Sequence, residues 1–427
     1  MMARLFYCFL LYLALPLVWL RLLWRSRKQP EYLQHLGERW GFYRRREDSP
    51  LLWVHAVSVG ETRAAEPLIR ALQAQYPGHT LLLTGMTPTG REAGRQVYGE
   101  SVLQAYLPYD YPGAVARFLR HFRPQFGVLM ETEVWPNLLA ACRRQGVPVV
   151  LANARLSERS ARGYERFSAL ARPAFAALAG AAAQSESDGE RLRHLGADRV
   201  EVCGNLKFDV SLPEDKCALG RAWRSALGER RVFLAASTRE GEEELLLAAW
   251  RQAQPDALLV LVPRHPQRFG EVAALLDRQG WRSRRRSDGL PEAEAQVWLG
   301  DSMGEMVAYY CLADLAYIGG SLLPLGGQNL IEAAACGCPV LVGPHTFNFA
   351  QASEDALACK AASRVENAEV LVGEVKRLFA QPQARAAMRA AALAFTAAHR
   401  GATARVLAAI SRCLDQAEHC TARHPRR

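Results

Sequence analysis

Ionisable side chains follow several runs of β-forming residues, and the first of these side chains is Glu61. Residues 55–62 lead from such a run through small residues into Glu61. A carboxylate at the carboxyl end of a strand could take a proton from an attacking hydroxyl, as a general base. The same spacing also suits a helix cap, with Ser58 as the cap and Glu61 at the third helical position. Both interpretations are open from these residues alone.

A second group of carboxylates occupies residues 130–137 (Met-Glu-Thr-Glu-Val-Trp-Pro-Asn), again directly after a predicted strand. Two carboxylates that alternate with threonine and precede Trp-Pro are unusual for a plain turn. We expect a functional role for at least one of them, and Glu131 is favoured because it lies nearer the strand end. The alternative is an acid that caps the next helix.

A lysine stands out in residues 204–209 (Gly-Asn-Leu-Lys-Phe-Asp), which close the first half of the chain. Nearly all other basic residues are arginine, and only five lysines occur, namely Lys28, Lys207, Lys216, Lys360 and Lys376. At a junction between domains the ammonium group of Lys207 could meet an anionic substrate. A plain surface lysine is the alternative.

In the second half of the chain, polar segments at 236–243, 262–266 and 301–305 each follow a predicted strand. Hydroxyl and amide groups at the start of a helix can hold an anion. Arg264 can bind a phosphate through two parallel hydrogen bonds. Residues 282–286 (Arg-Ser-Arg-Arg-Arg), in contrast, are predicted to form a solvated loop, with a binding patch as the alternative.

The strongest pattern in the second half covers residues 318–344. The glycine pair Gly326 and Gly327 opens a predicted helix whose unpaired N–H groups could face a phosphate. The helix dipole is worth about 0.3–1 kcal/mol for such an anion. Glu332 lies one turn further, where its oxygens could accept from both ribose hydroxyls. The alternative is a packed glycine turn followed by an exposed glutamate.

Strand-like and helical segments alternate along most of the chain, which predicts parallel sheets covered by helices on both faces. The alternation pauses at 205–219, so we predict two doubly wound α/β domains, 31–210 and 211–427, behind an N-terminal anchor, 1–30. Ligands of such folds bind beyond the carboxyl ends of strands, where the residues above stand. The predicted strands are 51–57, 80–85, 101–107, 126–130, 148–152, 180–184, 199–203, 231–236, 257–262, 295–299, 314–318 and 339–342.

The composition of the chain restricts the classes of partner that it could bind. The chain has 427 residues and a net charge of +10, which suggests an anionic partner such as a phosphorylated substrate or an anionic membrane. The ten cysteines include no Cys-x-x-Cys pair, which argues against a zinc site and a disulfide framework. We expect neither a metal nor a cofactor. Basic residues are dispersed without an aromatic-interleaved stripe, so nucleic-acid binding is not expected.

The N-terminal segment is apolar from Leu5 to Trp24 except for Arg21, and basic residues follow it directly. Twenty helical residues span about 30 Å, the thickness of the bilayer core. The segment therefore predicts a transmembrane anchor, with the rest of the chain on the cytoplasmic side by the positive-inside rule. An interfacial helix and a buried core helix are the alternatives.

Five segments in this order resemble the signature sequences of one family, the lipid A 3-deoxy-D-manno-octulosonic acid (Kdo) transferases. The segments are 58–61, 130–137, 204–209, 263–266 and 326–332. The resemblance runs over nearly the whole chain, to about Thr403. It implies a GT-B fold, in which two Rossmann-like domains face a cleft, the first binding the acceptor and the second the CMP-sugar donor.

The resemblance also implies the substrates, the location and the roles of residues. The donor would be CMP-Kdo and the acceptor a lipid A precursor, lipid IVA, at the cytoplasmic face of a Gram-negative inner membrane during lipopolysaccharide synthesis. Glu61 would be the catalytic base, with Glu131 and Lys207 stabilising the transition state. CMP would contact Pro263, Arg264, Met303, Gly304, Glu305, Asn329, Leu330, Ile331 and Glu332.

Two other classes of protein stay open on the sequence. One is a different GT-B enzyme, such as a lipid-linked glycosyltransferase that uses a UDP-sugar or a nucleotide-sugar epimerase. The other is a membrane-tethered binding protein with a decayed site. The nucleotide that is bound separates the first from a Kdo transferase, and substitution of Glu61 separates the second.

Overall fold

The computed structural model describes residues 2–27, 29–44, 49–209 and 212–423, which fold into two compact units. Unit 1 comprises Met1–Asp209 together with Gly401–Arg427, and unit 2 comprises Val210–Arg400. The sequence had placed everything after residue 210 in the second domain. The chain instead returns to unit 1 at Gly401, because the apolar face of the last helix, including Val406 and Ile410, is buried in the core of unit 1.

Unit 1 is built on a parallel sheet of seven strands in the order β3-β2-β1-β4-β5-β6-β7. The chain first extends the sheet to one side of β1 and then crosses to β4 on the other side. The point where the strand order reverses therefore lies between β1 and β4, and a doubly wound sheet binds its ligands at this point. The strands are β1 (Leu51–His55), β2 (Thr80–Gly85), β3 (Leu103–Tyr106), β4 (Phe126–Met130), β5 (Val149–Ala154), β6 (Gly180–Ala183) and β7 (Val200–Val202).

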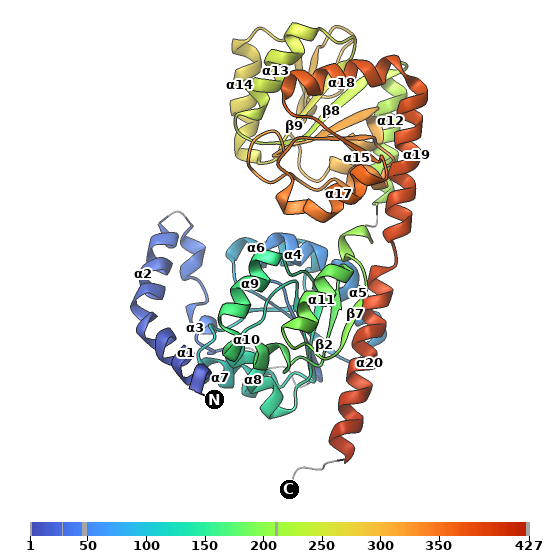
Figure 1. Cartoon of the computed structure of the whole chain (residues 1–427). Helices are drawn as coiled ribbons and strands as arrows, with labels where there is room; N and C mark the ends of the chain where they lie inside the picture. The colour runs from blue at the N-terminus through green and yellow to red at the C-terminus, as the bar shows by residue number, and fades with distance from the viewer. Residues whose placement is uncertain (1, 28, 45–48, 210–211, 424–427) are drawn as a thin grey trace. The chain divides into compact units, whose positions relative to one another are not determined.

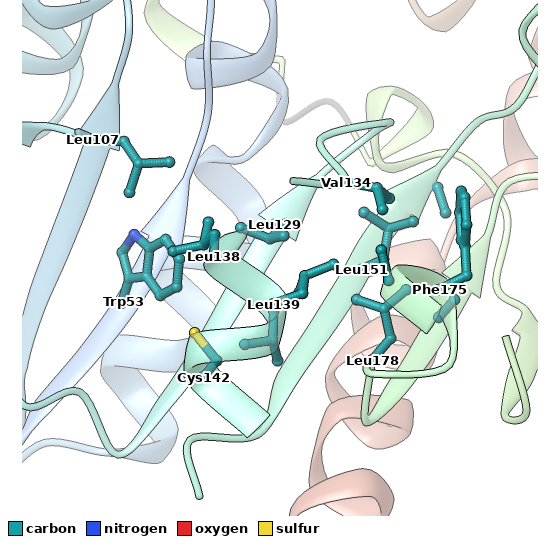
Figure 2. Close-up of a cluster of buried hydrophobic side chains, with 14 of the residues drawn as sticks. Trp53, Leu107, Leu129, Val134, Leu138, Leu139, Cys142, Leu151, Phe175 and Leu178 are labelled. Atoms are coloured by element: carbon teal, nitrogen blue, oxygen red, sulfur yellow. The ribbon is translucent and has the colours of Figure 1, made fainter. Parts of the chain in front are cut away.

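The strands of unit 1 bury both faces, so successive side chains enter two different layers of core. Trp53, Leu129 and Leu151 point into the layer drawn in Figure 2, where they meet Leu139 and Phe175 from the covering helices. Each fully buried leucine or phenylalanine of this kind contributes about 1.5–3 kcal/mol. The packing is close at Gly127, where a Cβ atom would lie 2.5 Å from the Trp53 ring.

Unit 2 repeats the architecture with a second parallel sheet, in the order β10-β11-β9-β8-β12-β13-β14. Its reversal point lies between β8 and β12. The strands are β8 (Val232–Thr238), β9 (Leu258–Pro263), β10 (Ser283–Arg285), β11 (Val297–Leu299), β12 (Leu315–Ile318), β13 (Val340–Val342) and β14 (Ala362–Arg364).

Helices cover both sheets (Figure 1). Those of unit 1 are α1 (Met2–Leu13), α2 (Leu15–Ser26), α3 (Leu36–Arg39), α4 (Val59–Ala64), α5 (Glu66–Gln75), α6 (Pro88–Tyr98), α7 (Pro112–Phe122), α8 (Pro136–Gln145), α9 (Glu158–Arg166), α10 (Ser168–Phe175), α11 (Glu186–His194) and α20 (Ala402–Arg423). Those of unit 2 are α12 (Glu214–Leu227), α13 (Glu242–Ala253), α14 (Phe269–Arg278), α15 (Met306–Leu312), α16 (Ile331–Ala335), α17 (Ala350–Ala358), α18 (Ala368–Ala380) and α19 (Pro382–His399).

All twelve predicted strand segments contain a strand, but the sequence missed β10 and β14. The prediction that 282–286 is a loop was wrong, because Ser283–Arg285 pairs with β11 as the edge strand β10. A short edge strand can be this polar because its charged side chains remain in solvent. Arg285 forms an ion pair of 2.9 Å with Asp301.

The apolar N-terminal segment forms two helices, α1 and α2, with an angle of 49° between their axes. Within the described residues no single helix is both long and apolar enough to cross a bilayer, although this bent pair qualifies when its two halves are taken together. The predicted single transmembrane helix is therefore broken at Ala14.

Candidate active site

The site in unit 1 forms where the strand order reverses. Glu61 follows β1 and Glu131 follows β4, and these strands are direct neighbours with His55 opposite Leu129. The carboxyl ends of parallel strands meet at one edge of the sheet, so the two carboxylates lie on the same rim. The electrostatic effect of Glu131 on the pKa of Glu61 reflects this proximity.

Glu61 is held rigidly at the first turn of α4. Its Oε2 accepts from the backbone N–H of Val57 at 2.8 Å, and its Oε1 accepts from the Ser58 hydroxyl at 3.0 Å. Ser58 caps the helix and accepts from the N–H of Glu61 at 3.4 Å. The helix-capping interpretation is therefore correct, and it fixes the carboxylate in one orientation.

The environment of Glu61 also suits proton transfer. Burial raises the pKa of its carboxyl, and the negative charges of Glu131 and Glu133 raise it further. The hydrogen bonds from Val57 and Ser58 oppose these effects, and the pKa settles at about 7. A general base works best when its pKa lies near the working pH, so this carboxyl can accept a proton under neutral conditions.

Glu131 adopts a left-handed backbone conformation, with φ of 57°. This conformation is rare outside glycine and marks a position that the surrounding fold constrains. The backbone N–H of Glu131 donates to Ala152 on β5 at 3.0 Å. Its Oε1 receives Lys207 Nζ at 3.3 Å, and both side chains are partly buried. The structure thus brings the three predicted residues of unit 1 together, with a cation paired to the second carboxylate.

Asn153 positions the lysine, and the sequence analysis did not select it. Its side chain is fully buried, its φ is 51°, and its Oδ1 accepts from the N–H of Leu206 at 3.0 Å. The neighbouring Asn205 accepts from the N–H of Lys207 at 3.0 Å. A single asparagine at a strand end carries no periodic signal, although asparagine tolerates the left-handed conformation better than most residues.

Glu133 is the carboxylate of residues 130–137 that the sequence favoured less than Glu131. Its carboxylate accepts from Trp135 Nε1 at 2.6 Å, and burial raises its pKa. The Trp135 ring in turn packs edge-on against the buried His55 ring, with the ring centroids 5.9 Å apart. Glu133 therefore contributes charge beside Glu61 while its own orientation is fixed by tryptophan.

In unit 2, Pro263 ends β9 and Arg264 follows it. The backbone N–H of Arg264 donates to Thr238 O at 3.0 Å, which ties the loop after β9 to the end of β8. Arg264 Nε donates to Gln328 Oε1 at 3.1 Å. Arg264 and the glycine-rich segment, predicted to share a phosphate, are thus in direct contact through Gln328.

The glycine-rich segment is an ordered turn. Gly326 and Gly327 have φ values of 92° and 71°, which glycine adopts freely. Asn329 organises the start of α16, since its Oδ1 accepts from Ile331 N at 3.0 Å and its Nδ2 donates to Glu332 Oε1 at 3.1 Å. The Ile331 N–H predicted to face a phosphate therefore has an asparagine oxygen as its partner here, and Leu330 is buried behind it.

The third predicted donor segment, residues 303–305, directly precedes α15. Met303 is 59% exposed and Gly304 has a φ of 75°. Glu305 forms an ion pair of 3.1 Å with Arg286 and also accepts from the Ser302 hydroxyl. These residues follow β11, which neighbours β9, so they lie on the same rim of the sheet as Arg264.

A buried carboxylate that the sequence analysis missed supports the reversal point of unit 2. Glu242 is fully buried and accepts from the backbone N–H groups of Arg239 at 2.9 Å, Gly320 at 2.6 Å and Leu322 at 3.1 Å. It also accepts from the Tyr317 hydroxyl at 2.5 Å. Four donors satisfy the charge, as a buried carboxylate requires. Glu242 therefore joins the loop after β8 to the loop after β12.

Comparisons with known proteins agree with this architecture. The family model described as 3-deoxy-D-manno-octulosonic-acid transferase (kdotransferase) matches residues 34–210. A 3-deoxy-D-manno-octulosonic acid transferase of Bordetella pertussis is 48% identical, over 92% of this chain and 96% of its own. Another, from Haemophilus influenzae, is 38% identical over 95% of this chain and 97% of its own.

Solved structures of lower identity share the fold. A glycosyltransferase from Rickettsia africae is similar over 86% of this chain and 99% of its own, with a TM-score of 0.57 and 14% identity. A UDP-GlcNAc 2-epimerase from Neisseria meningitidis is similar over 85% of this chain and 100% of its own, with a TM-score of 0.59 and 18% identity.

Two parallel seven-stranded sheets, each carrying charged residues where its strand order reverses, define a protein of the GT-B fold. The identity with the curated relatives, held over nearly the full length of both chains, decides the family within that class. The chain belongs to the 3-deoxy-D-manno-octulosonic acid (Kdo) transferases.

Proposed function

We propose that this enzyme transfers Kdo from CMP-Kdo to lipid IVA in lipopolysaccharide synthesis, with inversion at the anomeric carbon. One observation carries the proposal: a partly buried carboxyl with a pKa near 7, Glu61, stands beside the ion pair of Glu131 and Lys207. The arrangement supports proton transfer from a bound hydroxyl. The family supports Kdo as the transferred sugar.

In the proposed mechanism, Glu61 accepts the proton of an acceptor sugar hydroxyl as its oxygen attacks the anomeric carbon of Kdo. The new C–O bond forms on the face opposite the phosphate, and the bond between that carbon and the phosphate oxygen breaks. The electron pair of the broken bond leaves with CMP. Because the attack comes from the opposite face, the configuration of the anomeric carbon is inverted. The transition state has oxocarbenium character. The Glu131–Lys207 pair places a fixed dipole beside the reacting groups, and such preorganised charge stabilises a transition state.

For the donor, we assign CMP to the rim of unit 2. The guanidinium of Arg264 suits the phosphate, because it presents several donors in a fixed plane. Asn329 and Glu332 offer polar groups to the ribose, with Pro263, Leu330 and Ile331 as apolar contacts. The segment Met303, Gly304 and Glu305 completes the proposed binding surface.

For the acceptor, a cavity of about 470 Å³ lies against α4 in unit 1, between residues 29–35 and α6. Arg63, Arg91 and Arg95 line it, against the two acidic residues Glu31 and Glu92. Arg91 and Arg95 form ion pairs with Glu38 and Glu92. The phosphate groups of an acceptor would compete with these carboxylates for the arginines.

The proposed location is the cytoplasmic face of the inner membrane. A lipid acceptor cannot leave the bilayer cheaply, so an enzyme held at the membrane meets it at a higher effective concentration. The exposed apolar side chains of α1 and α2 support this attachment.

The test is a reaction of the purified chain with CMP-Kdo and lipid IVA, followed by mass spectrometry of the product. We expect a product heavier by at least one Kdo, formed about 10²–10⁴-fold more slowly by Glu61→Gln. Glu190→Gln, which alters an exposed carboxylate on α11 away from the proposed acceptor cavity, is the matched control and should retain activity. CMP should raise the melting temperature and UDP should not. A response to UDP alone would assign the enzyme to another GT-B activity.

A further inference from the structure

The N-terminal helix pair has a broad apolar face that no other described part of the chain covers. Its large exposed side chains are Met2, Leu5, Phe6, Phe9, Leu10, Leu13, Leu17, Leu20, Leu23 and Trp24. Residues 2–27 contain no acidic residue and four arginines, at positions 4, 21, 25 and 27. An apolar face bordered by positive charge and tryptophan fits the interface of an anionic bilayer.

The opposite side of α1 packs against the rest of unit 1. Tyr7 donates its hydroxyl to Asp110 at 3.1 Å, and Cys8 Sγ donates to Asn137 Oδ1 at 3.4 Å. Further along, the Tyr111 hydroxyl donates to the carbonyl of Leu11 at 2.8 Å. Asp110 is buried at this contact and also caps α8, accepting from the N–H groups of Asn137 and Leu138.

The second helix is docked as well. Trp19 stacks on Trp40 with ring centroids 5.6 Å apart, and Leu22 is 4% exposed. Both halves of the bent pair therefore use one side against the rest of unit 1, and the other side carries the exposed apolar residues. The contacts run from Tyr7 to Leu22, which is most of the length available for crossing a membrane.

A helix that crosses a bilayer is surrounded by lipid over about 30 Å of its length. Crossing would require both helices to leave unit 1, which would strip Tyr7 from the buried Asp110 and expose Trp40. It would also carry Arg21 into the hydrocarbon, where arginine is strongly disfavoured. Lying in the plane of the membrane keeps every contact with unit 1 and places the apolar side chains in lipid.

We propose that α1 and α2 lie in one leaflet of an anionic bilayer as a bent in-plane anchor, with both helix ends and unit 1 on the same side. The arginines extend their charged ends to the headgroups, as long basic side chains do at such interfaces. This inference depends on the membrane attachment in the proposed function. It does not depend on which sugar the enzyme transfers.

The topology is tested with a protease-cleavable tag ahead of Met2 on the full chain in Gram-negative cells. An in-plane anchor keeps the tag protected in intact spheroplasts and exposes it in inverted inner-membrane vesicles. A crossing helix gives the reverse pattern and overturns the proposal. A tag after the C-terminus is the control, because both topologies keep it inside.

The lipid contact is tested by flotation of the purified chain with vesicles of phosphatidylglycerol and phosphatidylethanolamine. We expect Phe9→Asp combined with Leu20→Asp to reduce bound protein at least tenfold. Leu245→Asp changes a leucine on α13 of unit 2 that is also exposed, at 45%, and should leave binding unchanged. Circular dichroism checks that each variant is folded.

Two other results of the flotation experiment would contradict the proposed anchor. Equal binding to uncharged phosphatidylcholine vesicles would overturn the anionic preference. A protein that ignores vesicles and instead forms dimers through α1 and α2 would show that a second copy covers the face. Neither flotation nor the tag assay requires catalysis, so a failure of the Kdo transfer assay would leave this inference standing.

Discussion

Substitution of Glu61 by glutamine should stabilise the protein while it removes activity. The pKa of Glu61 in the fold, about 7, lies above the ordinary glutamate value of 4.5. The folded state therefore holds the proton more tightly than the unfolded chain, and the stability from this group declines as the pH rises from about 4.5 to about 7. At pH 8 the charged carboxylate is present in its unfavourable, partly buried position.

The magnitude follows from the two pKa values. A shift of one unit corresponds to about 1.4 kcal/mol, so charging Glu61 in the fold costs about 3 kcal/mol well above pH 7 and under about 1 kcal/mol at pH 5. Glutamine is neutral at both pH values and matches the shape. Its oxygen can accept from Val57 N and its amide can donate to the Ser58 hydroxyl. The gain in stability should thus grow by about 2–3 kcal/mol between pH 5 and pH 8.

Thermal unfolding at the two pH values measures this gain. A domain of about 200 residues shifts its melting temperature by roughly 2–4 °C per kcal/mol, so the advantage of Glu61→Gln should widen by roughly 4–12 °C from pH 5 to pH 8. The same variant should lose about 10²–10⁴-fold in kcat. Glu190→Gln should show neither effect. A glutamine variant whose stability relative to the parent is independent of pH would refute the raised pKa.

The remaining predictions concern the same two rims. The kcat/KM of the parent enzyme should rise about tenfold per pH unit below about 7 and then level off, as a pH–rate profile in a mixed buffer would reveal. Lys207→Met should lower kcat by about 10²–10³-fold in steady-state assays yet leave the CMP-induced rise in melting temperature intact, because the lysine lies in unit 1. Gly319→Ala should cost about 1–3 kcal/mol and weaken CMP binding in calorimetry, since its Cβ would lie 2.4 Å from Ser237 O. Glu242→Ala should destabilise unit 2 by roughly 3 kcal/mol or more in urea titrations and abolish CMP binding, because several buried donors lose their acceptor.

The strands could be predicted because a doubly wound sheet buries both of its faces. Each central strand therefore consists of a continuous run of apolar residues. Leu258–Pro263 has this character throughout, and Leu51–His55 has it up to its last residue. Ser283–Arg285 does not, because an edge strand needs no apolar run, and backbone pairing alone defines it. The return of α20 to unit 1 could not be predicted, since its apolar residues would suit the core of either unit.

Some residues of the two sites could likewise be identified from the sequence, and others could not. Glu61, Glu131 and Lys207 could be selected because charged residues at strand ends stand out against apolar surroundings. Asn153 and Glu242 could not, because their role depends on burial among backbone N–H groups from distant loops. The break at Ala14 has a signal in Pro16, which lies in the first turn of α2 and interrupts a continuous helix. Hydropathy does not register this signal, because it measures the length of an apolar segment but neither its bend nor its docking.

The two interpretations of Glu61 that the sequence left open prove to be physically compatible. A capping carboxylate is fixed by hydrogen bonds to Val57 and Ser58, and these bonds alone would lower its pKa. Burial and the nearby charges of Glu131 and Glu133 act in the opposite direction and are larger. The cap therefore supplies orientation, while the surrounding residues of the rim supply basicity. Lys207 forms its ion pair with Glu131 rather than with Glu61, which leaves the basicity of Glu61 in place. A carboxylate in a plain solvent-exposed cap would have the same geometry but would be too weak a base at neutral pH, so the rim, and not the capping motif, makes this position suitable for catalysis.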